Sequence, residues 1–207
     1  MSILISDRLS EMLAKAPRSV QASLSEAVRL LHGVTPENVE RRAKWLAGRK
    51  PSLYVIRAGK MRYIFSFQGE AIVLLAMTTG DERNLEVGYV DRFRLMTKDD
   101  QAEEIDDKIG GTFHQLVDSE EVAGAIATTN AFGWMSDTYE VESYDIEQEK
   151  IRVKISWSAV GEQDDDRTYH GDKLNGSAVA VIDQQGEVSY EDVGASVEDL
   201  NGERPEE

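Results

Sequence analysis

Cysteine is missing from this chain of 207 residues. Its absence excludes a disulfide-stapled scaffold, a thiolate zinc site and a cysteine nucleophile. Histidine is scarce as well, and no two of His32, His114 and His170 have the spacing of metal ligands. We therefore expect neither a bound metal nor another cofactor, and a zinc hydrolase is not expected.

Long hydrophobic runs are also missing. The longest apolar run, Ala71–Met77, is far shorter than the roughly 20 residues that a membrane-spanning helix needs. The first thirteen residues, MSILISDRLSEML, contain neither the basic segment nor the apolar segment of a secretory signal. The sequence predicts a cytoplasmic protein with no membrane partner.

Basic residues are rare in the second half of the chain. Residues 1–98 contain 16 Lys and Arg against 10 Asp and Glu, a net charge of +6, whereas residues 99–207 contain 7 against 29, a net charge of −22. Such asymmetry is typical of two modules with different partners. A basic module suits polyanions such as nucleic acid, and an acidic module could cover it within the same chain by imitating phosphate. Alternatively, the acidic residues only keep the chain soluble.

In the first half, hydrophobic periodicity predicts three helices followed by strands. The helices are expected at 6–16, capped by Ser6 or Asp7, at 18–32 and at 36–47. Runs rich in β-branched and aromatic residues predict the strands Leu53–Ala58, Met61–Phe67 and Ala71–Thr78, with a weaker strand over Leu85–Leu95.

The second half is expected to form an antiparallel sheet with a helix. The helix is expected at 118–128, with strands at about 138–146, 150–159, 177–183 and 186–194 and tight turns at Asn175-Gly176 and Asp183–Gly186. Residues 97–109 are acidic and are interpreted as a linker or a short exposed helix. The fold class is thus α+β, with a basic domain over 1–96, an acidic domain over 110–200 and a disordered tail over 201–207.

The segment Ser52–Met77 indicates a β-hairpin that carries two arginines. If Gly59-Lys60 forms a two-residue type II′ turn, Arg57 and Arg62 face each other directly, with their Cβ atoms about 5 Å apart. Two like charges so placed lower stability unless an anion lies between them, and a phosphate would fit because guanidinium forks match its oxygens. A pair splayed into water, or neutralised by carboxylates of the same chain, is the alternative.

A basic cluster precedes this hairpin. Functionally, it would follow a nucleic-acid backbone, whereas structurally it would be an ordinary polar helix face with a loop. Trp45 lies within it and is interpreted as a core residue rather than a platform for base stacking. The candidate nucleic-acid-binding residues are Arg41, Arg42, Lys44, Arg49, Lys50 and Lys60.

The order of a helical pair, a basic segment and LYVIRAGKMRYIFSFQGEAIVLLAM resembles the RelE/ParE superfamily of type II toxins over roughly residues 1–95. The resemblance implies helices packed on an antiparallel sheet, and either metal-independent cleavage of messenger RNA on the ribosome or inhibition of DNA gyrase. It also implies that the toxin activity is restrained, either by the chain's own acidic domain or by a separate antitoxin-like protein. On this basis the candidate catalytic residues are Arg57, Arg62, Arg83, Glu82 and Tyr89.

One departure from the family bears on cleavage. RelE-type ribonucleases carry lysines on the strand before the turn, where this chain has Leu53 and Val55. Metal-free cleavage needs a base for the 2′-hydroxyl, an acid for the leaving oxygen and cations around the developing charge. The cations are present here, but the base is not identified beyond Glu82 and Tyr89. A non-catalytic interaction protein, whose acidic domain binds a basic partner or mimics nucleic acid, therefore stays an alternative.

Overall fold

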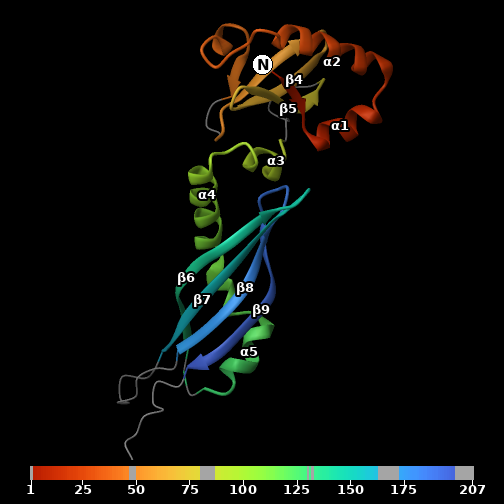
Figure 1. The fold of residues 1–207 in the computed structure, drawn as a ribbon. Coiled ribbons are helices and arrows are strands. Elements are labelled where there is room, and N and C mark those ends of the chain that lie inside the picture. The colour runs from red at the N-terminus through yellow and green to blue at the C-terminus, as the bar shows by residue number, and fades with distance from the viewer. Residues whose placement is uncertain are drawn as a thin grey trace, which may run out of the picture. The chain divides into compact units, whose positions relative to one another are not determined.

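The computed structural model of this chain describes residues 2–46, 50–79, 87–129, 131, 133–162 and 173–198. It is a mixed α+β protein that divides into two compact units, Met1–Lys98 and Asp99–Glu207 (Figure 1). The expected α+β class is confirmed. The expected tail over 201–207 lies outside the described residues.

The first unit is built on a five-stranded sheet in the order β1-β5-β4-β3-β2. Only β1 and β5 are parallel, and every other neighbouring pair is antiparallel. The three main strands were predicted to within one residue, because their β-branched and aromatic runs are bounded by turn residues. The strands are β1 (Ile3–Ile5), β2 (Lys44–Leu46), β3 (Leu53–Ala58), β4 (Met61–Gln68) and β5 (Ala71–Thr78).

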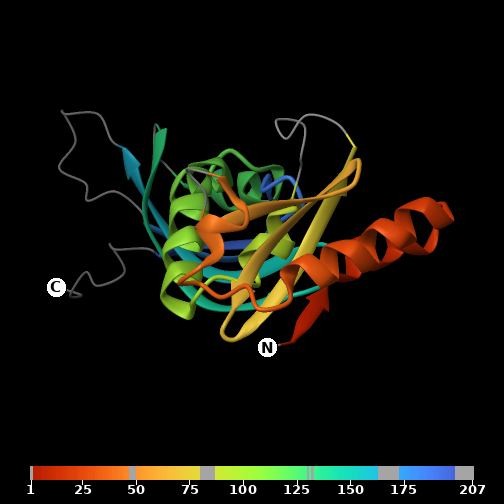
Figure 2. The same cartoon turned by 90° about the horizontal axis from the view of Figure 1, so that it is seen from above.

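Two helices, α1 (Asp7–Ala14) and α2 (Arg18–Leu31), pack on one face of this sheet (Figures 1 and 2). Ser6 caps α1, since its Oγ accepts a hydrogen bond from the backbone N–H of Leu9 at 3.3 Å. The core between helices and sheet contains Leu9, Leu13, Ala27 and Leu31 from the helical side and Ile56, Tyr63, Phe65, Ile72 and Leu74 from the strands.

The helix predicted over 36–47 was wrong. The segment instead forms a turn, a short 3-10 helix η1 (Val39–Arg41) and the edge strand β2. Asn38 accounts for the difference, because its side chain accepts from the N–H of Thr35 and donates to the carbonyl of Gly33, both at 3.0 Å. Such local side-chain bonds compete with a helix, and pairing with β3 then favours a strand.

The strand predicted over Leu85–Leu95 was also wrong where the structure describes it. Residues Tyr89–Phe93 form the short helix α3. Tyr89 and Phe93, four residues apart, stack with ring centroids 6.1 Å apart, and Arg94 contacts Asp91 at 3.4 Å. Both contacts have helical spacing.

The second unit is built on an antiparallel sheet in the order β6-β7-β8-β9. Side chains of β7 alternate between a buried and a more exposed face, since Ile151, Val153, Ile155 and Trp157 are buried whereas Lys154 is exposed. All four strands are longer than predicted. They are β6 (Gly133–Ile146), β7 (Ile151–Glu162), β8 (Lys173–Ile182) and β9 (Val188–Glu198).

One of the two turns predicted here was wrong. The turn at Asp183–Gly186 is present, with Gly186 at a φ of 81° and its N–H bonded to Asp183 O at 3.0 Å. Asn175-Gly176, in contrast, lies inside β8. Gly176 is needed there because the Trp157 ring approaches its backbone closely.

Three helical segments complete the second unit: α4 (Lys98–Gly110), the 3-10 helix η3 (Phe113–Leu116) and α5 (Glu120–Ile126). The segment over 97–109, expected to be a linker or a short exposed helix, is mostly the helix α4. It buries Gln101, Ile105 and Ile109, which recur every four residues on one side. Among the described residues, no helix is long and apolar enough to cross a membrane.

Candidate nucleic-acid interface

The hairpin of β3 and β4 has the predicted register. Arg57 pairs with Arg62 and Ala58 with Met61 across the turn. Gly59 has a φ of 59° and Lys60 does not have a positive φ, which is the type II′ pattern. The local sequence therefore fixed which residues face each other.

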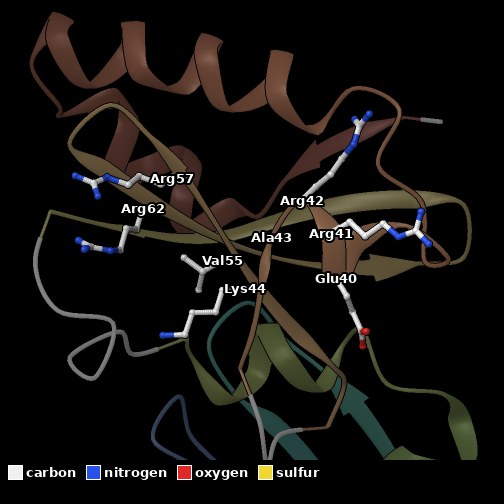
Figure 3. A pocket seen from close by; sticks show the side chains of 8 residues that line it. All are labelled: Glu40, Arg41, Arg42, Ala43, Lys44, Val55, Arg57 and Arg62. Atoms are coloured by element: carbon white, nitrogen blue, oxygen red, sulfur yellow. The ribbon is translucent and has the colours of Figure 1, made fainter.

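Arg57 and Arg62 lie on the sheet face opposite α1 and α2. Their side chains leave neighbouring strands and point the same way in Figure 3. Arg57 is exposed, and its Nε donates to the carbonyl oxygen of Gly59 at 3.1 Å. In the part of the chain that the structure describes, no carboxylate forms an ion pair with Arg57, so its remaining N–H groups are available to an anion.

Lys44 joins the two arginines from the edge strand. It pairs with Val55, which is two residues before Arg57 on β3, so Lys44 and Arg57 share one face of the sheet. In Figure 3 the Lys44 amino group points to the same side as both guanidinium groups. Three cations from three adjacent strands thus lie on one side.

These cations line an open groove of about 430 Å³. Val55 lies between Lys44 and the arginine pair and gives the groove an apolar floor (Figure 3). A groove with several cations and one carboxylate suits an extended anion better than a neutral ligand. Its lining residues are Glu40, Arg41, Arg42, Ala43, Lys44, Val55, Arg57 and Arg62.

Arg41 and Arg42 line the same groove but point away from the arginine pair, on the other side of β2 in Figure 3. Arg42 also has a structural contact, because its Nη1 donates to the carbonyl of His32 at 3.3 Å. That carbonyl directly follows α2, where backbone acceptors need partners. Arg41 and Lys44 therefore do not share the helix face that the sequence predicted.

Other predicted site residues are not brought into the groove. Lys50 and Lys60 are exposed but do not line it. Tyr89 is buried at 4% exposure and stacks on Phe93, and it also does not line the groove. Arg49, Glu82 and Arg83 lie outside the described residues.

The environment of Trp45 differs from the prediction. It was interpreted as a core residue, yet its side chain is 51% exposed on the edge strand. Its neighbour across the ladder is Tyr54, which belongs to the face covered by the helices, so Trp45 points away from Lys44. Glu40 was not singled out from the sequence, and no sequence signal marked it as a lining residue.

The described residues that line the groove provide cations for anion binding. No histidine or tyrosine is among the described residues that line it, and its single carboxylate is the exposed Glu40. No group of three or more metal-ligating side chains is found among the residues that the structure describes. Comparisons with protein-family models, with curated proteins and with solved structures find no match to this chain.

Proposed function

We propose that the first unit is a RelE/ParE-like, toxin-type module that acts on RNA, and that the acidic second unit restrains it within the same chain. The observation that carries this proposal is the direct pairing of Arg57 with Arg62 beside an open groove. Two guanidinium groups held side by side match the oxygens of one phosphodiester. Lys44 and Arg41 extend the positive lining along the groove, as a nucleic-acid backbone requires.

RNA binding is tested on the full chain by fluorescence anisotropy with a labelled single-stranded RNA over a range of salt concentrations. The double variant Arg57→Gln/Arg62→Gln should bind at least about tenfold more weakly, and its salt slope should fall by roughly 0.7 for each lost phosphate contact. The matched control, Arg18→Gln/Arg29→Gln, removes two exposed charges from α2. If both variants lose the same RNA affinity, net charge alone explains the binding and the proposal is overturned.

Cleavage is the narrower part of the proposal and needs its own experiment. In metal-free cleavage the 2′-hydroxyl gives its proton to a base and its oxygen bonds to phosphorus, while the bond from phosphorus to the 5′-oxygen breaks and the 5′-oxygen takes a proton from an acid. We expect 2′,3′-cyclic phosphate and 5′-hydroxyl ends from RNA incubated with the full chain and EDTA. If RNA is bound but stays intact, the proposed ribonuclease activity is excluded and only the proposed RNA binding is retained.

Such an outcome would favour the second candidate, a non-catalytic interaction protein. The burial of Leu53 and Val55 supports this candidate, since they are 0% and 5% exposed where the family's ribonucleases carry lysines. The restraint is tested separately, by comparing RNA affinity in Glu140→Gln/Glu142→Gln with that in Glu11→Gln/Glu70→Gln. A larger gain from the second-unit pair supports restraint, and equal gains would exclude it.

A further inference from the structure

The second unit has a candidate binding surface of its own, the outer edge of β6. β6 and β9 are the two edge strands of the sheet; α5 packs against β9, and η3 contacts β6 at Tyr139, whose ring centroid lies 4.8 Å from that of Phe113. No other strand pairs with the outer edge of β6 among the described residues, although β6 is fourteen residues long. An edge of this length presents a row of backbone donors and acceptors to an added strand.

The charges on β6 are all of one sign. The strand contains no lysine or arginine, and its four charged residues, Asp137, Glu140, Glu142 and Asp145, are exposed. Within the described residues, Glu140, Glu142 and Asp145 make neither ion pairs nor side-chain hydrogen bonds.

The carboxylates of the other edge strand are engaged within the unit. Glu191 and Asp192 contact Arg152 at 2.6 Å and 3.7 Å, and Glu198 accepts a hydrogen bond from Asn175 at 2.8 Å. The negative charge left without a counter-ion thus lies along β6 and not along β9. A second copy of this strand would bring like charges together, so the β6 edge disfavours self-pairing.

The two sides of β6 differ in chemistry. Glu140 and Asp145 pair with Ser156 and Arg152, on the face away from the helices. On the other face, Tyr139 and Tyr144 are half-buried and donate to Asp106 Oδ1 at 2.6 Å and to Gln101 Oε1 at 2.8 Å, both on α4. An added strand would therefore meet carboxylates on one side and half-buried aromatic and aliphatic side chains on the other.

From this arrangement we infer that β6 is a docking edge for an extended segment of a partner protein in which basic and apolar residues alternate. The segment adds a fifth strand to the sheet, with its Lys or Arg side chains against Glu140 and Asp145 and its apolar side chains against Tyr139 and Val141. Backbone hydrogen bonds supply affinity, and the alternating side chains supply specificity. The two bulges of β6, at Ser136/Thr138 and Val141/Ser143, interrupt regular pairing, so an added strand would pair regularly only in the stretches on either side of each bulge. This inference is independent of RNA binding by the first unit.

The experiment uses the full chain and a labelled peptide of four Lys-Val repeats, with affinity measured by fluorescence anisotropy. Glu140→Lys/Asp145→Lys should weaken binding at least about tenfold, because like charges then face each other. The control Asp118→Lys/Glu187→Lys makes the same charge change at exposed positions off this edge, and it should change affinity less than about twofold by screened long-range attraction alone.

Two further measurements separate strand addition from simple charge attraction. A peptide of four Lys-Pro repeats has the same charge but lacks alternate N–H donors, so it should bind much more weakly. Hydrogen exchange should show that the Lys-Val peptide protects amides of β6 and not those of β9. Equal affinity for both peptides, equal losses in both charge-reversal variants, or absence of β6 protection would each overturn the inference.

Discussion

Arg57 and Arg62 face each other across the β3–β4 ladder, immediately beside the Gly59-Lys60 turn. Directly opposed like charges destabilise a strand pair by a few tenths to about 1 kcal/mol. Arg57→Gln should therefore raise the free energy of unfolding by about 0.5 kcal/mol in a low-salt buffer without multivalent anions.

Inorganic phosphate should reverse that difference, because only the wild-type pair can hold the anion with both guanidinium groups. Urea unfolding in phosphate, and in chloride of equal ionic strength, provides the measurement. Arg29→Gln on α2 is the control; because it keeps both Arg57 and Arg62, phosphate should stabilise it as much as the wild type. A phosphate effect of the same size in all three proteins would show that no anion is held by the pair.

The hairpin could be predicted from sequence because its information is local. A positive-φ glycine and strict alternation together determine which side chains share a face, and the register of Arg57 with Arg62 follows from them. The groove could not be predicted in the same way. Lys44 was grouped with Arg41 on one helix, but Asn38 diverts the backbone and pairing with Val55 turns Lys44 toward the arginines.

The errors share this physical origin. Trp45 looked like a core residue by composition, yet an edge strand leaves one side of it uncovered. Asn175-Gly176 has the composition of a tight turn, but it lies inside β8. The Trp157 ring on the neighbouring strand β7 occupies the space that a Cβ at position 176 would need. In both cases the position of the segment within its sheet, and not its local composition, determined the outcome.

A buried hydrogen bond joins the helices of the first unit to its sheet. Tyr63 is fully buried, and its hydroxyl lies 2.6 Å from Ser23 Oγ on α2. Tyr63→Phe should lower the free energy of unfolding by about 1 kcal/mol, the usual net contribution of such a bond. Tyr54→Phe serves as the control, since Tyr54 is half-buried and its hydroxyl makes no hydrogen bond within the described residues. Urea unfolding of both variants checks the prediction, which fails if the two losses are equal.

Close packing of Trp157 on β8 makes Gly176 the least replaceable of the described glycines in the second unit. A Cβ at position 176 would lie 2.6 Å from Trp157 Cζ2 and 2.5 Å from the carbonyl oxygen of Gly194. Since a backbone carbonyl in a paired strand cannot move aside freely, Gly176→Ala should lower the free energy of unfolding by about 2 kcal/mol or more.

The matched control is Gly124→Ala in α5, where a Cβ would meet nothing within 4 Å. Alanine is the better helix former, so this variant should gain roughly 0.5–1 kcal/mol. Urea unfolding followed by tryptophan emission compares the two, and an unchanged midpoint in Gly176→Ala would contradict the close approach.

Asp91 on α3 places a carboxyl in a poorly solvated position. Burial raises the pKa of this carboxyl above its ordinary value of 3.8, and the opposing attraction of Arg94 and Arg8 is smaller. A carboxyl whose pKa is higher in the folded than in the unfolded protein binds protons more readily when folded. Its contribution to stability is therefore complete below about pH 3.8 and is lost as the pH rises through the raised pKa.

Asp91→Asn should accordingly be more stable than the wild type at pH 7, because the buried negative charge is removed while a polar side chain of the same size stays. The advantage should shrink as the pH falls toward 4, where the wild-type carboxyl is protonated in the folded protein. Urea unfolding between pH 4 and 8 measures the difference, with Glu70→Gln in the exposed β4–β5 turn as a control that should show little pH dependence. If Asp91→Asn is instead less stable at pH 7, the contact between Asp91 and Arg94 at 3.4 Å outweighs the cost of burial.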